Sequence, residues 1–243
     1  RPKETGRTGG GTARPAASGN AAGPDAGDTW GGNNPDGQRD LEGADRSGVN
    51  LAGTKIRAAN LKGANLSGAR LSRANLAGAD LSGANLSEAD LGQAGMAGVN
   101  LTSATVVNVN LFWTDMKGAI LKDAVLTSCR MNRVSLIGAD LSGANFSHSN
   151  MIEADLRNAD MTNARFQSSN MNGADLSRAI MPGANFHLAM IRDSMWIATD
   201  VRGASFKEAS LHRSDFTLAK WDDTTNFPDK FDPENTGPKD VND

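Results

Sequence analysis

The chain has 243 residues, of which 38% are apolar and 5% aromatic, with a formal net charge of −3 and one cysteine. This length and composition suffice for one elongated core, and the chain holds no run of 18 apolar residues that would span a membrane. The lone cysteine excludes an intramolecular disulfide as a source of stability.

Residues 1–38 are rich in Gly, Ala, Pro and Ser, and Trp30 is their only large apolar side chain. Such a segment buries too little apolar surface to offset its ordering entropy, so we expect a disordered lead-in. It also lacks the apolar stretch of a signal peptide. Trp30 lies just before the repeats and is expected to cover the first coil, because an open sheet edge invites pairing with other chains.

From Arg39 to Asp223 the chain repeats itself every five residues. The 37 unit centres run from Leu41 to Trp221, and 36 of them are apolar. Arg46 is the exception, which suggests that the first coil is frayed or is itself part of the cover at this end. Two residues before the centre, 24 positions hold Ala and 12 hold Ser, Thr, Val or Cys. The period fits neither a helix nor a strand, and it predicts a solenoid whose units bury the centre and the small residue against neighbouring coils.

Similar side chains recur 20 residues apart, which predicts a square coil of four units. Methionines at 131, 151 and 171 form one such column, and phenylalanines form a ladder on the next wall. At about 4.8 Å per coil, nine coils give a rod roughly 45 Å long. The ladder comprises Phe146, Phe166, Phe186 and Phe206.

Residues 224–243 follow the repeats and carry two basic against five acidic residues, whereas residues 39–223 carry 19 of each. The net charge therefore lies in this tail, and the repeat region as a whole is neutral. We expect Trp221, Phe227 and Phe231 to form a C-terminal cap, with a Pro-rich acidic tail beyond it.

Units such as Ala-Asn-Leu-Lys-Gly and Ala-Asn-Leu-Ser-Gly, which begin at Ala59 and Ala64, resemble the pentapeptide repeat family over about three-quarters of the chain. The resemblance implies an all-β fold, a right-handed quadrilateral β-helix, with the centre and the small residue pointing inward. The segment 227–233 resembles the ending of cyanobacterial and plastid members. That resemblance implies a setting such as the thylakoid lumen or the bacterial cytoplasm.

Some members of the family resemble B-DNA in size and charge and inhibit DNA gyrase. Such mimicry needs a strongly acidic rod, because DNA carries one charge per roughly 1.7 Å. Asp is also favoured beside turns for structural reasons, so a gyrase-directed DNA mimic remains an alternative function. The second half of the rod places acids on two adjacent walls with arginines among them: Asp140, Asp155, Asp160, Asp175, Asp200 and Asp215 beside Arg157, Arg178, Arg202 and Arg213.

Candidates for catalysis are few. His148, His187 and His212 fall at outward positions too far apart to share a metal ion, and Cys129 takes an inward small-residue position. No base is placed to activate any of the serines. We therefore expect no enzyme, no cofactor, no metal and no direct nucleic acid binding.

Large apolar residues at outward positions are the informative departures from the repeat. Grouped exposed apolar side chains commonly mark a contact surface, although they can also be covered by the chain itself. One cluster comprises Phe112 and Trp113 with Val107 and Val125, and the other comprises Ile180, Leu188, Met190, Met195 and Ile197.

These features predict a rigid protein-binding or scaffolding rod whose partner is an unidentified protein or a second copy of the chain. A purely structural rod that assembles end to end is a further alternative.

Overall fold

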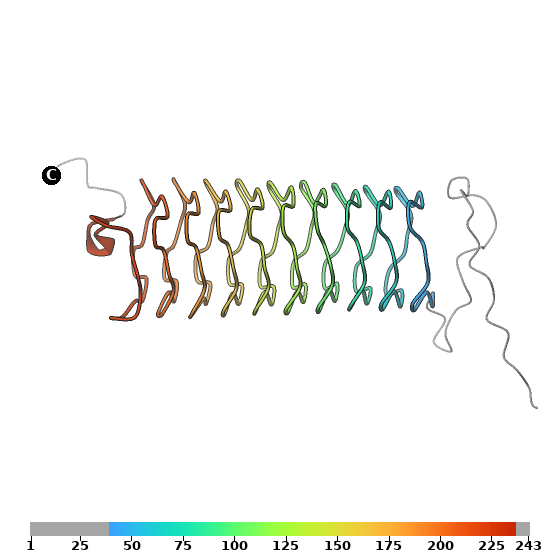
Figure 1. The fold of residues 1–243 in the computed structure, drawn as a ribbon, viewed down its shortest axis with the longest axis horizontal. Coiled ribbons are helices and arrows are strands. Elements are labelled where there is room, and N and C mark those ends of the chain that lie inside the picture. The colour runs from blue at the N-terminus through green and yellow to red at the C-terminus, as the bar shows by residue number, and fades with distance from the viewer. Residues whose placement is uncertain (1–38, 237–243) are drawn as a thin grey trace, which may run out of the picture.

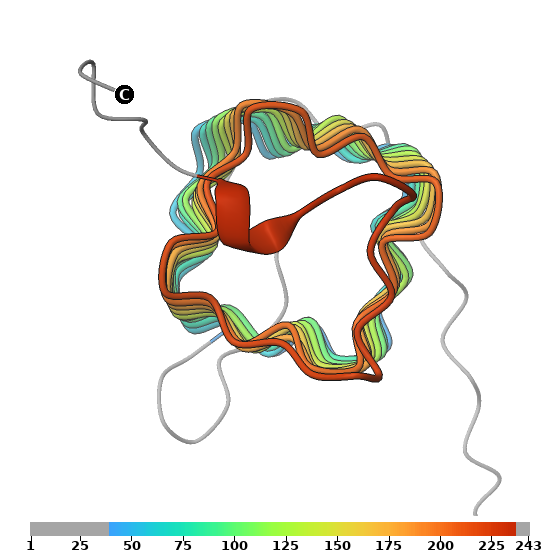
Figure 2. The ribbon, with the colours of Figure 1, turned by 90° about the vertical axis from the view of Figure 1, so that its left-hand side faces the viewer.

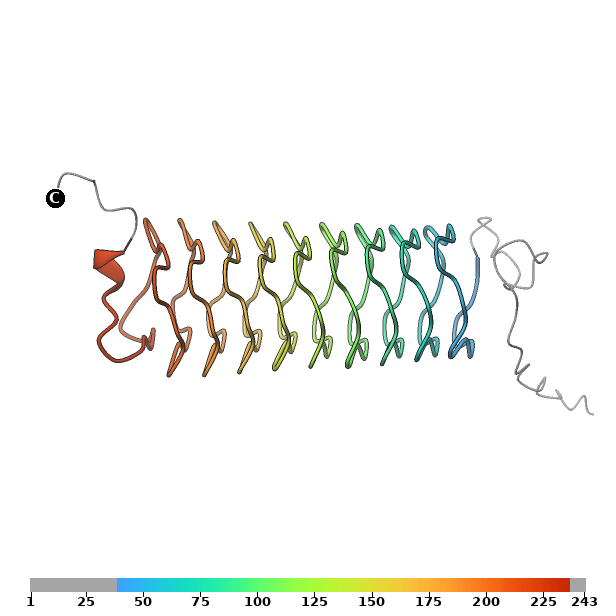
Figure 3. The same ribbon diagram turned by 90° about the horizontal axis from the view of Figure 1, so that it is seen from above.

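The computed structural model describes residues 39–236, which form one rod of stacked coils (Figure 1). Seen end-on, every coil is a square with four corners (Figure 2), and the view from above has the same regular stacking (Figure 3). The expected quadrilateral β-helix is therefore confirmed. The expected disordered lead-in with Trp30, and the last residues of the tail from 237, lie outside the described residues.

The coils pair through single-residue parallel bridges rather than long strands. Each residue just before a centre pairs with the residue 20 positions later, from Asp40 with Asn60 to Asp200 with Lys220. The coil length of 20 residues inferred from the sequence is thus the length the backbone uses. The helix within residues 39–236 is a 3-10 helix, η1, Pro233–Asn235, and no helix in this range is long and apolar enough to cross a bilayer.

The interior is filled by the two inward positions of each unit. From Leu51 to Phe216 every centre is buried, and from Ala59 to Ser214 so is every small residue two before a centre. Arg46 is half-buried, and its guanidinium donates a hydrogen bond to the carbonyl of Asp45 at 2.9 Å. The charged side chain at this centre therefore has a backbone carbonyl as its hydrogen-bond acceptor.

The backbone hydrogen bonds explain why Asn and Asp recur before the centre. In the unit around Leu66, the N–H groups of Leu66 and Gly68 donate to the following coil at 2.7 and 2.8 Å. The N–H of Asn65 donates to the preceding coil at 2.9 Å, and that of Ala69 closes the turn onto the Leu66 carbonyl at 3.0 Å. The fifth N–H, that of Ser67, has only the side chain: the Asn65 Oδ1 accepts it at 3.2 Å. An Asn or Asp at this position therefore completes the unit.

Each turn places its third residue, two after the centre, in the left-handed region. The φ values there run from +51° at Ala58 to +71° at Gly183. A turn hydrogen bond with a positive φ at its third residue alone is the type II arrangement, which favours glycine. Yet 22 repeat units hold another residue at this position, so each of them carries backbone strain.

The aromatic side chains form two stacked columns inside the second half of the rod. Phe146 and Phe166 stack at 5.1 Å, Phe166 and Phe186 at 4.9 Å, and Phe186 and Phe206 at 5.0 Å. Trp196 comes from the opposite wall and meets Phe186 edge-on at 5.5 Å across the interior. The sequence pattern did not anticipate this contact between the two columns across the interior.

Buried serine hydroxyls form hydrogen bonds with the indole of Trp196 and with each other. Its Nε1 donates to the Ser194 Oγ at 2.9 Å, and Ser194 and Ser214 hydroxyls lie 2.9 Å apart. Ser214 in turn donates to the Ile191 carbonyl at 2.6 Å. Serine at these small-residue positions therefore satisfies a polar group that Ala would leave without a partner.

The coil shifts by one residue at its C-terminal end. Ser205 pairs with Asn226, 21 positions later, so Phe227 stacks on Phe206 at 5.3 Å as another rung of the ladder. Phe231 lies 5.3 Å from Phe216, and η1 crosses the end of the square (Figure 2). Trp221 is half-buried, edge-on to Phe227 at 6.2 Å. The coil thus continues past residue 223, and Phe227 forms the last rung of the ladder, at the end where the cap is predicted.

Replacement of Phe166 tests the ladder. Phe166→Ala should lower the free energy of unfolding by about 3–5 kcal/mol, because it leaves a cavity between two stacked rings. Phe166→Leu should cost clearly less, about 1–2 kcal/mol, since Leu fills the same inward position in earlier coils. Chemical denaturation of the three proteins measures the difference. Equal losses for both variants would contradict a packing role for the ring.

Replacement of Asn145 tests the turn bond. Its Oδ1 accepts the Ser147 N–H at 3.0 Å and the Ser147 hydroxyl at 2.7 Å. Asn145→Ala should lower the free energy of unfolding by about 1 kcal/mol, since it orphans that N–H. Asn145→Asp keeps the acceptor and should retain most of the stability, as measured by thermal and denaturant unfolding.

Candidate interaction surface

The square cross-section gives the rod four walls, defined here by their unit centres. Outward side chains come from the residue before each centre and the two after it, and almost all are exposed or half-buried. Because four units make one coil, walls A and C lie opposite each other, as do walls B and D (Figure 2). Wall A has its centres at 41, 61 and so on to 221, wall B at 46 to 206, wall C at 51 to 211, and wall D at 56 to 216.

The first predicted cluster divides between two walls. Phe112 and Trp113 follow a centre of wall C, whereas Val107 and Val125 flank centres of wall B. Trp113 is 60% exposed, and Phe112 is half-buried with its ring edge-on to Trp113 at 6.3 Å. The Arg130 guanidinium lies 5.5 Å from the Phe112 ring centroid. Phe112, Trp113 and Arg130 therefore form one aromatic and cationic patch, and the two valines belong to another wall.

A shallow groove runs along wall C beside this patch. It measures about 510 Å³ and passes from Gly53 through Arg73 and Gly92 to Phe112 at its end. A Cβ on Gly92 would lie 3.0 Å from the Asn110 Nδ2, so the groove has no room for a side chain at this position. That Nδ2 group donates to the carboxylate of Asp90 at 2.7 Å.

The second predicted cluster encircles the rod instead of forming one face. Ile180 is 51% exposed on wall A, Leu188 49% on wall B and Met190 43% on wall C. Met195 and Ile197 both lie on wall D, where they line a groove of about 400 Å³ with Arg157 and Arg178. A single partner surface therefore meets only part of this cluster.

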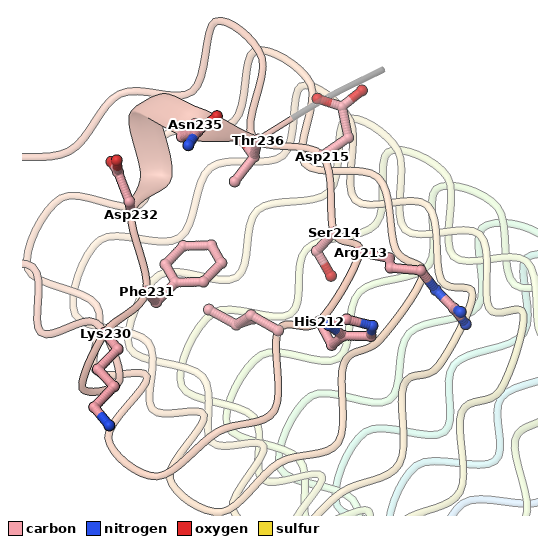
Figure 4. A pocket seen from close by; sticks show the side chains of 10 residues that line it. His212, Arg213, Ser214, Asp215, Lys230, Phe231, Asp232, Asn235 and Thr236 are labelled. Carbon is pink, nitrogen blue, oxygen red and sulfur yellow. The ribbon is translucent and has the colours of Figure 1, made fainter. Parts of the chain in front are cut away.

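A pocket of about 610 Å³ lies at the C-terminal end, between the last coil and the segment that crosses it (Figure 4). His212, Arg213 and Lys230 line it together with Phe231 and Asp232. The sequence pattern did not indicate this pocket, because it depends on the one-residue shift before Phe227.

Aspartates in the second half of the rod form hydrogen bonds and ion pairs within the fold. The Asp140 Oδ1 accepts the Ser142 N–H at 3.0 Å, as expected for a turn residue. Hydrogen bonding from the Arg157 side chain lowers the pKa of Asp155 below its usual value, and Arg202 does the same for the pKa of Asp200. These acids thus serve turns and ion pairs along their own walls.

The predicted candidates for chemistry stay apart. His148 and His212 are exposed and His187 is half-buried, and within residues 39–236 no three His, Cys, Asp or Glu side chains come together as a set of metal ligands. Cys129 is 2% exposed, and its Sγ lies 2.8 Å from the Val106 carbonyl oxygen. Burial raises the pKa of this thiol from 9.0 to about 11.

The repeats match a known family of repeat sequences. A family model described as pentapeptide repeats, in eight copies, matches residues 40–73, 79–118, 94–133, 107–143, 119–158, 129–167 and 159–194. No curated protein matches the chain.

Solved structures of pentapeptide repeat proteins are similar to the chain. One is HetL of Nostoc sp. strain PCC 7120, involved in heterocyst differentiation regulation, with 26% identity over 74% of this chain and 86% of its own, at a TM-score of 0.47. Another is QnrB1, a plasmid-mediated fluoroquinolone resistance protein, with 16% identity over 74% and 94% at 0.46. A third comes from the Arabidopsis thaliana thylakoid lumen, with 26% identity over 58% and 66% at 0.18.

The pH dependence of stability tests the burial of Cys129. The unfolded thiol loses its proton near pH 9.0 and the folded one near 11, so between these values unfolding releases a proton and rising pH favours the unfolded state. Relative to Cys129→Ala, the wild type should lose about 2–3 kcal/mol of unfolding free energy from pH 9 to 11. A constant difference between the two proteins across this range would contradict the raised pKa.

Proposed function

The chain belongs to the pentapeptide repeat family, and from that premise we propose that it works without catalysis, as a rigid rod that binds protein through wall C. Phe112 and Trp113 form the centre of the proposed contact, with Arg130 beside them. The rod supplies a fixed surface, because each coil is held to its neighbours by backbone hydrogen bonds along its whole length.

The conformation of Trp113 is the observation that supports this proposal most. The residue has a φ of +54°, at a turn position where glycine is the commonest occupant of the chain's own repeats. A side chain in this region costs about 1–2 kcal/mol, and the indole buries little of itself in return, since the side chain is 60% exposed. Folding alone gives no reason for Trp here, whereas binding does, because Trp and Arg are enriched where interfaces derive their energy.

Arg130 adds hydrogen-bond donors to the same patch. Its guanidinium covers the Phe112 ring while remaining exposed, so it can still donate hydrogen bonds to a partner. The polar groove that ends at Phe112 is lined by Arg73, Gln93 and Asn110. An aromatic anchor with a polar rim of this kind is typical of protein interfaces.

The two alternative functions draw less support. A DNA mimic needs an acidic rod, and here residues 39–223 hold as many basic as acidic groups, with Arg157 and Arg202 paired to aspartates of the acidic walls. End-to-end stacking needs an open last coil, and η1 with Phe231 crosses that end.

A paired capture experiment tests the proposal. Immobilised wild type should retain a protein from an extract of the source organism that Phe112→Ser/Trp113→Ser does not retain. Retention of the same proteins by both would contradict a contact at wall C.

Substitution by glycine separates binding from folding. Trp113→Gly should raise the free energy of unfolding by about 0.5–1 kcal/mol, since it relieves the left-handed strain at some cost in chain entropy, and it should weaken capture at least tenfold. Leu218→Gly is the matched control: Leu218 has a φ of +61° and is 76% exposed, but on wall D. It should gain similar stability without loss of capture. Loss of capture by both variants would point to a general effect of turn flexibility.

A further inference from the structure

Two opposite walls of the neutral rod carry opposite charge. Over nine successive units, wall A holds seven acids against three basic residues, and wall C holds six arginines against three acids. The basic residues of wall C include no lysine. Wall A carries Asp40, Glu42, Asp80, Asp123, Asp140, Asp160 and Asp200 with Lys62, Lys122 and Arg202; wall C carries Arg70, Arg73, Arg130, Arg133, Arg192 and Arg213 with Asp90, Glu153 and Asp193.

Most of these charges have no ion-pair partner within residues 39–236. On wall C, Arg133 pairs with Glu153 and Arg213 with Asp193, which leaves four arginines outside any salt bridge. On wall A, the Asp200–Arg202 pair similarly leaves the other acids outside. The unpaired groups that matter below are Arg70 and Arg130 on wall C, and Asp80, Asp140 and Asp160 on wall A.

Apolar residues of the two walls lie at matching heights along the rod. Trp113 of wall C and Ile120 of wall A are seven residues apart, about a third of a coil, so their heights differ by roughly 2 Å. Met190 of wall C and Ile180 of wall A differ by half a coil, about 2.4 Å. All four are exposed, with Ile120 at 42% and Ile180 at 51%.

The charges match in the same register. Arg70 lies half a coil from Asp80, and Arg130 half a coil from Asp140, again about 2.4 Å in height. Two copies placed side by side without rotation or axial shift therefore bring wall C of one against wall A of the other. Arginine then faces aspartate and Met190 faces isoleucine, because all of these residues precede a centre, and Trp113 lies at the turn on the edge of the contact.

We propose that wall C receives wall A of a second copy of this chain, so that the rods associate side by side and parallel. This inference rests on the proposed function, since it names a partner for the same wall. One copy uses its wall C in the contact and the other uses its wall A, so the pair still has one free wall A and one free wall C. Association therefore does not close at a dimer but extends into rows of rods. One wall is narrow and largely polar, so the contact should be weak and sensitive to salt.

Charge reversal at the position before the centre provides the test. Asp140→Arg/Asp160→Arg makes wall A basic, and Arg70→Asp/Arg130→Asp makes wall C acidic. Both pairs of substitutions introduce residue types that the chain already has just before a centre, as at Arg165 and Asp155. The variants should therefore fold. Asp115→Arg/Asp215→Arg makes the same change in charge on wall D and serves as the control.

Sedimentation velocity at several concentrations, in low and high salt, measures the association. The wild type and the wall D control should form a series of species beyond the dimer at hundreds of micromolar in low salt, and they should return to monomer in 0.5 M salt. Each reversed variant alone should stay monomeric. An equimolar mixture of the two should associate again, because the basic wall A of one variant then meets the acidic wall C of the other.

Three results would overturn the inference: a wild type that stays monomeric in low salt, a wall D control that loses association as the wall A variant does, or a mixture that stays monomeric. Species that stop at a dimer would also contradict a contact between two different walls. The capture experiment separates this outcome from failure of the proposed function. Monomeric wild type that still captures a protein through Phe112 and Trp113 leaves wall C as a binding surface for a different partner.

Discussion

The structure depends on one constraint: every backbone N–H of a five-residue unit must find an acceptor in a coil that has no long strands. Three of these groups bond to the coils on either side and one closes the turn, which leaves a single N–H for a side chain to satisfy. Asn or Asp before the centre accepts it, as Asn65 does for Ser67. The same bond recurs in most units, whereas units with Arg70 or Ile120 before the centre keep the same backbone hydrogen bonds without it. The backbone bonds between coils therefore hold the square, and the side chain completes it.

The square in turn limits what the interior can hold. Each unit contributes one large side chain and one small one, and nearly all are fully buried between Leu51 and Phe216. Larger groups are accommodated only in columns, as in the Phe146 ladder, or with a polar partner, as for Trp196 and Ser194. The single extra residue near the end lets Phe227 join the ladder and turns the chain across the last coil.

The outer positions are free of these demands, and function can vary there. A side chain such as Trp113 is held at a strained turn without burial, and Arg130 lies over its neighbour Phe112. Charges distribute by wall as well: the neutral total of residues 39–223 conceals an acidic wall A opposite an arginine-rich wall C. A rod of this kind presents four independent surfaces on one rigid frame, so each wall can bind without disturbing the others.

The sequence by itself determined the period, the inward positions and the coil of 20 residues, because phenylalanines that stack must recur once per coil. It also singled out Phe112 and Trp113 as departures from the repeat. Only the tertiary structure decided which of these departures share a surface. Val107 and Val125 belong to a different wall from Trp113, and the cluster from Ile180 to Ile197 encircles the rod. The physical reason is that five residues turn the chain by one corner, so neighbours in sequence point in different directions, while residues 20 apart lie side by side.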